Sequence, residues 1–478
     1  MSMISFIFFG LVAVVFILLI SANKIFKDDR KAVKIANAIL LISSYAFVIY
    51  ADWKFAAILA VLTLSTWFFA KKKSTGKYGV IVAILALAFF KYTNFFIESF
   101  AKIFGADYTA LNIILPLGIS FYTFSAISYI VDVSRNRIEP RNLGQVALYL
   151  AFFPKITSGP IQRSGEFFDQ IEKRRNVGWN TLAPGIQMFV FGLFKKIVLA
   201  DRLSVFVNQV YDTPLAFGSL TVFLAAVAYS LQIYFDFSGY SDMAIGISKI
   251  LGIDMPRNFN LPYLSHNVTE LWKRWHITLS SWLQDYLYIS LGGNRKGKVR
   301  TYINLILTMV IGGIWHGANW TYVIWGLMHG IALAVHKVWM TLTGSSSKKH
   351  STVANLVSIC LTFLFTTFCW IFFRAESLSK ALIIIKRIFS FERGLEQPYM
   401  WLIIAAVALV AASIIAFVKT NKNPDKKPAK KTNVSIVEGY YPIVDLTTFW
   451  GLVAFFVFCG MILCLAYTGG SPFIYGNY

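Results

Sequence analysis

The chain has 478 residues, of which 57% are hydrophobic, 17% aromatic and only 14% charged, and its mean hydropathy is +0.60. This balance excludes an ordinary soluble enzyme and predicts a polytopic membrane protein. The formal net charge of +22 does not indicate a nucleic-acid partner, because the basic residues cluster between apolar runs, as expected of cytoplasmic loops. We therefore expect a multi-pass protein of the cell membrane that contacts lipids and no nucleic acid.

Twelve apolar segments approach the roughly 20 residues that a membrane-spanning helix needs. They cover residues 4–20, 35–51, 54–70, 78–98, 112–131, 183–200, 218–236, 302–315, 319–341, 351–373, 400–418 and 446–468. Basic clusters between them, including the lysine-rich segment 419–431, place both termini outside the cytoplasm. The sequence thus predicts an all-α fold of about 12 transmembrane helices, with re-entrant segments, around a central cavity.

We expect one integral membrane domain over residues 1–478, with N-terminal helices in 1–111, a motif-bearing core in 112–341 and C-terminal helices in 342–478. Residues 143–175 form an apolar patch that Pro154, Gly159 and Pro160 interrupt. Proline and glycine prevent a continuous helix, so this patch is predicted to enter the membrane and return.

The most informative stretch is residues 258–330. It begins with an amphipathic segment at 269–290, which we expect to be helical, and continues through a glycine-rich basic loop at 292–297. An apolar run follows, in which Gly312, Gly313 and Gly317 surround His316 and are expected to break the spanning helix. An ionisable group at membrane depth indicates function unless protein buries it. We expect His316 to face a cavity, the alternative being a core histidine bonded to a neighbouring helix.

Other polar residues have two interpretations each. Asp236 either lines a cavity or anchors a helix end, and Asp285 either contacts substrate or is a solvated helix position. Arg295 and Lys296 complement phosphate groups, as in an acyl carrier such as coenzyme A, although topology-setting charge is the plainer explanation. The four cysteines show no Cys-x-x-Cys spacing, and we expect no metal site.

Seven motifs occur in order between residues 112 and 330, and together they resemble the membrane-bound O-acyltransferase family, in the branch of alginate O-acetylation membrane proteins and their D-alanine-transferring relatives. Each motif alone is weak, but their order on a multi-span chain is specific. They are Leu115–Phe124, Phe153–Ile161, Asp236–Gly246, Asn258–Tyr263, Trp272–Tyr288, Leu291–Arg295 and Gly313–Gly330.

The resemblance implies transfer of an acyl group to a hydroxyl, with His316 matching the family's catalytic histidine and His276 its second motif histidine. A histidine in a low-dielectric pocket stays neutral and can accept the hydroxyl proton. The resemblance also implies an acetyl group, a polysaccharide acceptor and an extracytoplasmic acetyltransferase-like partner. We expect acetyl-CoA as donor and no tightly bound cofactor. The residues we expect at the substrate are Asp236, Trp275, Asp285, Asn319 and Trp320.

Two alternatives stay open. One is a transporter of polysaccharide or lipid-linked sugar, in which His316 relays protons; the absence of a convincing inverted repeat counts modestly against it. The other is an acyltransferase of the same superfamily that acts on lipid or protein. His329 and His336 share a helical face, and we expect them to pack helices together.

Overall fold

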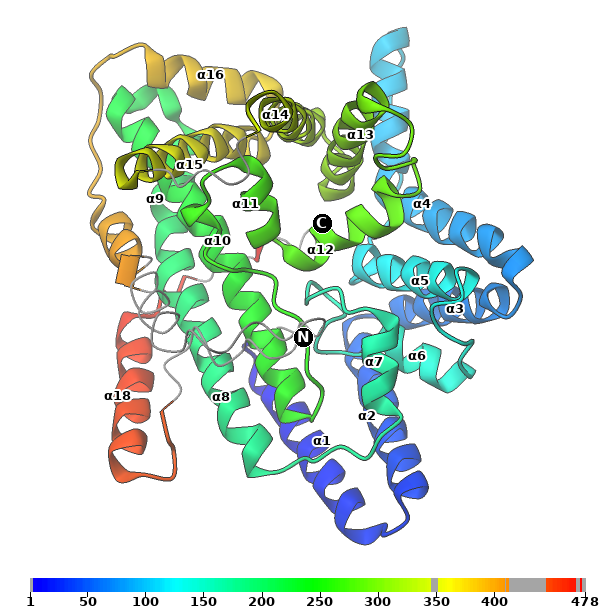
Figure 1. Ribbon diagram of the computed structural model, residues 1–478. Helices are drawn as coiled ribbons and strands as arrows, with labels where there is room; N and C mark the ends of the chain where they lie inside the picture. Colours follow the sequence, from blue (N-terminus) through cyan, green and yellow to red (C-terminus); the bar gives the residue numbers. More distant parts are fainter. Residues whose placement is uncertain (1–2, 345–350, 409, 412–443, 470–472, 475–478) are drawn as a thin grey trace. The chain divides into compact units, whose positions relative to one another are not determined.

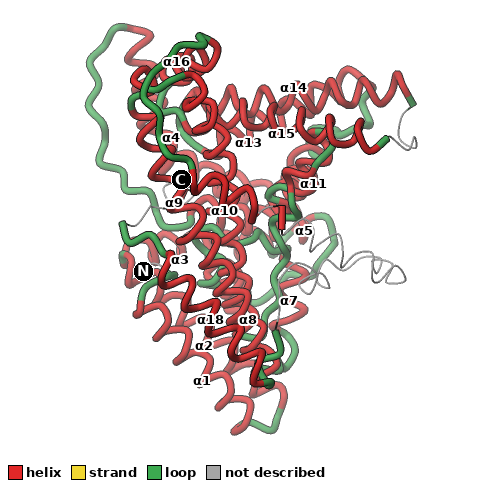
Figure 2. The backbone as a smooth tube through the Cα atoms, turned by 90° about the vertical axis from the view of Figure 1, so that its left-hand side faces the viewer, coloured by secondary structure: helices red, strands yellow, loops and turns green. Residues whose placement is uncertain are grey.

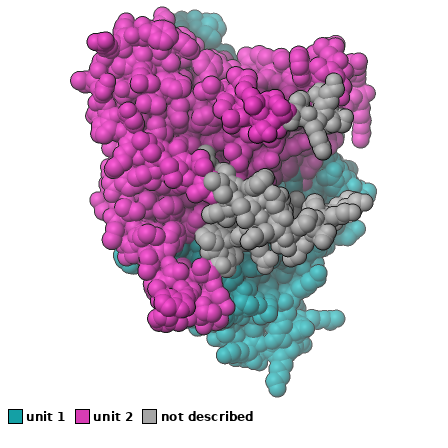
Figure 3. All heavy atoms as spheres, turned by 60° about the vertical axis from the view of Figure 1, so that its left-hand side comes forward, with its two compact units in different colours: residues 1–190, 241–256 teal, residues 191–240, 257–478 magenta. Residues whose placement is uncertain are grey.

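The computed structural model describes residues 3–344, 351–408, 410–411, 444–469 and 473–474. Over these residues the chain is helical and contains no strand (Figure 2). It divides into two compact units, one of residues 1–190 and 241–256 and one of residues 191–240 and 257–478 (Figure 3). The predicted all-α fold is confirmed, and the division into units was not predicted.

Residues 1–190 of the first unit form seven complete helices and most of an eighth, which Figure 1 labels α1 to α8. Side-chain caps separate consecutive helices, because an aspartate or asparagine oxygen binds a free backbone N–H of the first turn. Asp28 caps α2 at Lys31 N and Asp52 caps α3 at Lys54 N. These helices are α1 (Phe6–Ile25), α2 (Asp29–Ala51), α3 (Trp53–Ala70), α4 (Gly76–Phe104), α5 (Ile119–Ser134), α6 (Leu143–Ala151), α7 (Ser164–Ile171) and α8 (Trp179–Leu193).

The second unit contains the remaining helices and two π-helical segments, while α10 continues from it into the first unit. π-Helical turns are rare in proteins, and those that occur are often found at functional sites. The π-helical segments are η2 (Phe194–Ala200) and η5 (Leu283–Tyr288). The helices are α9 (Asp201–Asp212), α10 (Ser219–Ile250), α11 (Val268–Arg274), α12 (Ile277–Trp282), α13 (Lys298–His316), α14 (Trp320–Thr343), α15 (Thr352–Arg374), α16 (Leu378–Phe389) and α18 (Phe449–Leu465).

Eight helical stretches in the described residues are long and apolar enough to cross a membrane, and each coincides with one of the twelve predicted spans. Three further predicted spans correspond to shorter or more polar helices, namely α5, α13 and α18. The span predicted at 400–418 lies partly outside the described residues, of which 400–408 are helical, and the basic segment 419–431 lies wholly outside them.

The interruption predicted at residues 143–175 is present. α6 ends at Ala151, a buried turn follows, and α7 begins only at Ser164. Gly118 has a left-handed backbone (φ 73°) and approaches this turn so closely that a Cβ atom would lie 2.0 Å from the carbonyl oxygen of Ile156. The turn is therefore a packed part of the first unit.

The break predicted around His316 is confirmed at Gly317, after which α14 begins only at Trp320, and is wrong at Gly312 and Gly313. α13 continues through both glycines and ends at His316. The reason is close helix packing, since small residues let two helix backbones approach each other. A Cβ atom at Gly313 would lie 2.2 Å from the carbonyl oxygen of Tyr322 on α14, and one at Gly326 would lie 2.4 Å from that of Met309 on α13. α13 and α14 accordingly lie side by side (Figure 1).

The single helix predicted at residues 269–290 is also wrong. The chain forms α11, breaks at Trp275 and His276, and continues as α12 and η5. His276 has a left-handed backbone with φ 42°, a conformation that costs a non-glycine residue on the order of 1–2 kcal/mol. Asn258 holds the break, because its carbonyl oxygen accepts from Ile277 N and its Oδ1 accepts from the Thr278 hydroxyl at 2.6 Å.

Candidate active site

His316 is the last residue of α13 and is only 3% exposed. Three aromatic rings surround its imidazole: Trp315 at 4.8 Å between centroids, Trp325 at 5.1 Å and Phe373 at 5.2 Å. The chain leaves the helix directly after it, and α14 begins only at Trp320. His316 is thus held at a helix end, inside an aromatic enclosure.

A second buried histidine shares this enclosure. His329 on α14 lies 5.0 Å from Trp325, and its Nδ1 accepts a hydrogen bond from the indole of Trp272 at 3.4 Å. Two turns further along α14 and one turn earlier on α11, Thr269 hydrogen-bonds to His336 at 2.8 Å. Both histidines therefore join α14 to α11, as predicted for helix packing.

A cavity of about 450 Å³ lies beside this aromatic cluster, lined by residues of α11, α12, η5, α13, α14 and the loop after η5. Trp272 connects the two, because it lines the cavity and also packs against Trp325 at 5.8 Å. His316 was expected to face a cavity, but it is not among the residues that line this cavity. Trp325 contacts both His316 and Trp272.

The cavity combines an apolar wall with polar and basic groups. Leu305, Met309 and Leu333 supply apolar surface, whereas Lys273 and Lys337 supply positive charge. Lys337 Nζ donates to Asn294 Oδ1 at 2.9 Å, and the Tyr288 hydroxyl donates to the same oxygen. A pocket of this size with a few placed polar groups is typical of sites for organic ligands.

His276 is 1% exposed and packs edge-on against Phe237, with 4.6 Å between ring centroids. Burial lowers the pKa of His276 to about 3, because removal from water disfavours the charged imidazole. The side chain is therefore neutral at pH 7. Its strained backbone and neutral ring are consistent with a functional position.

Asp236 belongs to a buried charge cluster. Lys196 Nζ lies 2.6 Å from Asp236 Oδ1 and 2.8 Å from Asp201 Oδ1, and all three residues are at most 5% exposed. The backbone N–H of Ile474 donates to Asp236 Oδ2 at 2.8 Å. The structure thus gives Asp236 an ion-pairing role that fixes η2, α10 and the C-terminal segment to one another. Its predicted contact with substrate stays a prediction.

The other predicted substrate residues do not gather at one point. Trp275 is buried among aromatic rings that include Trp370 at 5.0 Å. Asp285 lies on η5 but is not one of the cavity's lining residues. Asn319 caps α14 by accepting from Thr321 N, and its amide donates to the carbonyl of Glu376 at 2.8 Å. Trp320 is 59% exposed.

Arg295 and Lys296 are exposed on the loop after η5 and do not line the cavity. Sequence reasoning missed the lysines that do line it, Lys273 and Lys337, and also missed Lys196. A signal existed for two of them, because Lys196 and Lys337 interrupt apolar spans, where a charged residue needs a partner or a wet surface. In the described ranges, no group of three or more His, Cys, Asp or Glu side chains could hold a metal ion.

Comparison with known proteins adds a family to this geometry. The model of the membrane-bound O-acyltransferase family matches residues 131–375. The peptidoglycan O-acetyltransferase of Helicobacter pylori is 40% identical over 335 residues, which cover 64% of this chain and 63% of that protein. The probable alginate O-acetylase of Pseudomonas syringae pv. tomato is 41% identical over 376 residues, or 74% of this chain and 70% of that protein. The teichoic acid D-alanyltransferase of Streptococcus thermophilus is 32% identical over 237 residues, covering 47% and 57% of the two chains.

Proposed function

This chain belongs to the membrane-bound O-acyltransferase family and is a multi-pass membrane O-acyltransferase, and from this premise we propose that it moves an acetyl group from cytoplasmic acetyl-CoA to hydroxyls of an extracytoplasmic polysaccharide. Its location would be a bacterial cytoplasmic membrane. The names of the relatives from H. pylori and P. syringae support the acetyl group and the polysaccharide.

The enclosure of His316 by Trp315, Trp325 and Phe373 is the observation that carries the proposal. In this low-dielectric site the neutral imidazole accepts the proton of the acceptor hydroxyl, and the oxygen attacks the thioester carbonyl. The C–S bond then breaks, and the leaving thiolate takes the proton from the imidazolium. Positioned proton transfer of this kind contributes a factor of about 10² to 10⁴ in rate. For His276, the histidine of a separate motif, we propose a role in orienting substrate.

The cavity next to Trp272 supports the donor assignment. Its volume of about 450 Å³ lies in the range of small-molecule sites, and Lys273 and Lys337 complement phosphate charge. In this proposal the pantetheine arm occupies the apolar part and the phosphates lie toward the lysines. Arg295 and Lys296, exposed on the adjacent loop, attract the donor from solution.

A second candidate is transfer of D-alanine, which the similarity to the S. thermophilus D-alanyltransferase favours. Both candidates use the same base and the same thioester chemistry, so the donor distinguishes them. In either case we expect an extracytoplasmic acetyltransferase-like partner protein to complete the transfer to the acceptor.

The experiment is thioester turnover by the purified protein in nanodiscs, supplied either with radiolabelled acetyl-CoA or with a radiolabelled D-alanyl thioester. Membranes that contain the partner are tested in parallel. We compare wild type with His316→Gln and, as a matched control, His266→Gln, whose side chain is 41% exposed and pairs with Glu270. Loss of turnover in His316→Gln alone supports the proposal. Equal turnover in all three proteins removes His316 as the base, and turnover only with a D-alanyl thioester selects the second candidate.

A further inference from the structure

A second cavity, of about 690 Å³, is lined only by residues of the first unit. Its walls are the first half of α2, the start of α6 and the residues that follow α7. No step of the proposed reaction uses it. Its lining changes character along α2, and this change indicates what it binds.

The residues that α2 contributes recur at three- and four-residue spacing, so they form one stripe along the helix. The stripe begins with Arg30 and Lys34 and continues through Ala38 to Leu41. Eleven residues of helix span about 16 Å. α2 is a candidate membrane span, and its charged residues lie at its N-terminal end. The stripe therefore changes from basic to apolar toward the middle of the span.

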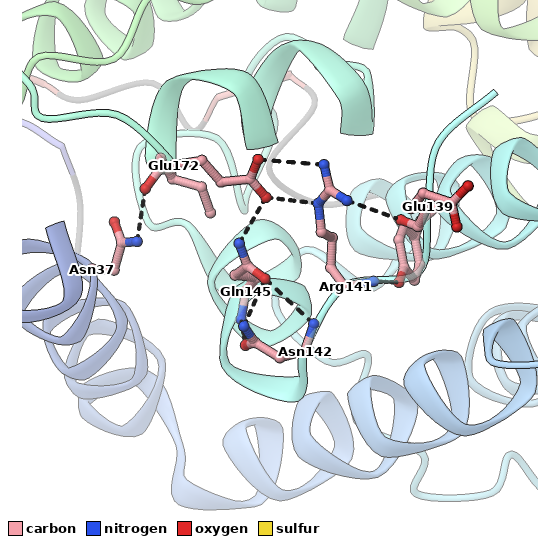
Figure 4. A network of polar contacts seen from close by, with 8 residues as sticks. Asn37, Glu139, Arg141, Asn142, Gln145 and Glu172 are labelled. Atoms are coloured by element: carbon pink, nitrogen blue, oxygen red, sulfur yellow. Dashed lines mark hydrogen bonds and ion pairs between the residues drawn. The ribbon is translucent and has the colours of Figure 1, made fainter. Parts of the chain in front are cut away.

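The acidic groups of the cavity are already neutralised within the protein. Glu172 accepts from Arg141 Nε at 2.7 Å and from Gln145 Nε2 at 2.9 Å, as Figure 4 shows. Asp29 pairs with Arg174 at 2.7 Å. No ion pair between Arg30, Lys34 or Lys173 and another residue occurs in the described part of the chain. The cavity therefore presents uncompensated positive charge.

The wall behind these charges is fixed before any ligand arrives. The amide of Asn37 donates to the carbonyl of Ile171 at 2.8 Å, and its oxygen accepts from the guanidinium of Arg175 at 2.8 Å (Figure 4 shows Asn37). Arg175 is 7% exposed, and its own carbonyl accepts from Asn23 at 2.9 Å. A preformed site loses less entropy on binding.

We infer that this cavity binds an anionic phospholipid from the leaflet that surrounds the basic end of α2. The phosphate lies between Arg30, Lys34 and Lys173, and the first part of an acyl chain follows Ala38 and Leu41. A free phosphate would use only the basic end of the stripe, whereas a phospholipid matches both its charge and its apolar continuation. The sequence predicts that this end of α2 lies on the cytoplasmic side, where the anionic lipids of the leaflet attract basic segments of proteins.

The test titrates the purified full-length protein in neutral detergent with phosphatidylglycerol and counts bound lipid by native mass spectrometry. We expect Arg30→Gln combined with Lys34→Gln to weaken binding about 10-fold or more, the size expected when two charges are removed at a lipid headgroup. The control is Lys24→Gln combined with Lys31→Gln, which removes the same charge from exposed positions outside the cavity. Retention of binding in the control and loss in the first pair support the inference.

A second variant tests the apolar half without touching charge. Ala38→Trp fills the stripe and is expected to weaken phosphatidylglycerol binding, whereas Ile42→Trp, at a position that is 69% exposed and outside the lining, is not. Three results would overturn the inference: equal loss in both charge pairs, unchanged binding in Ala38→Trp, or full displacement of lipid by inorganic phosphate. Because lipid binding is counted without acyl donor, the result is independent of the proposed reaction.

Discussion

Trp325 stands edge-on to His316, with ring centroids 5.1 Å apart and ring planes at 90°. The same indole lies 5.0 Å from His329 and stacks on Trp370 at 5.6 Å. Trp325 is therefore the residue through which α14 fixes the imidazole at the end of α13. Its position makes it a positioning residue for the proposed base.

Replacement of Trp325 by alanine is expected to lower kcat about 100-fold, because displacement of a catalytic group by about 1 Å can cost that factor. Trp325→Phe, which keeps a ring against His316, is expected to retain most of the activity. Acetyl-CoA turnover is measured for both variants and for Trp339→Ala, a 61% exposed tryptophan on the same helix. A folded Trp325→Ala protein with wild-type kcat contradicts the positioning role.

Two adjacent glycines on α13 are expected to respond differently to alanine. Gly313→Ala places a methyl group 2.2 Å from the Tyr322 carbonyl, whereas at Gly312 the nearest atom is the Leu283 side chain at 3.3 Å. Overpacking of this kind costs about 1–3 kcal/mol, so Gly313→Ala should lower the melting temperature in detergent and Gly312→Ala should change it little. Equal melting temperatures would show that α13 and α14 can separate without cost.

The buried cluster around Lys196 predicts an order of stabilities. Lys196→Met leaves Asp201 and Asp236 without their cation, whereas Asp236→Asn leaves Lys196 paired with Asp201 at 2.8 Å. Removing one partner of a buried ion pair costs about 3–5 kcal/mol, and we expect Lys196→Met to be the more destabilised variant. Thermal unfolding measures this, with the half-buried neighbour Lys195→Met as control. The reverse order would mean that Asp236 has a role beyond pairing.

Stability is expected to fall with acid through His276. Its pKa is about 3 in the folded protein and 6.5 ordinarily, so below pH 6.5 the unfolded chain binds a proton that the folded protein excludes. The stability present above pH 6.5 is thus lost as the pH falls toward 3, by about 2 kcal/mol at pH 5. Melting temperatures at pH 7.5 and 5.0 are compared with those of His276→Gln. A variant that loses as much stability as wild type would exclude His276 as the cause.

Affinity for the donor should depend on the cavity lysines more than on the exposed loop. Lys337→Gln is expected to raise the KM for acetyl-CoA about 10-fold, as for loss of one charge-assisted hydrogen bond, with kcat unchanged. Arg295→Gln is expected to have a smaller effect that disappears at high salt, because exposed charges are screened. A larger effect of Arg295→Gln at high salt would place the phosphates on the loop.

The sequence by itself determined the properties that depend on composition and local pattern. Apolar length predicted where helices run, with eight of the predicted spans matched by long apolar helices, because a helix in lipid must satisfy its own backbone and present apolar side chains. The sequence also showed that His316 interrupts an apolar run, and a histidine there is costly unless protein surrounds it.

Only the tertiary structure decided what each interrupting residue does. Gly312 and Gly313 looked like helix breakers, but their backbone conformation depends on a neighbour, α14, that approaches within contact of Gly313. A second break, which was not predicted, falls at His276, where hydrogen bonds from the chain to Asn258 stabilise a left-handed residue that no local preference predicts. Lys196 and Asp236 were separate charges in sequence, and only folding placed their atoms 2.6 Å apart. Long-range packing chooses among the conformations that a local sequence permits, and so the roles of these residues could not be assigned from their spacing.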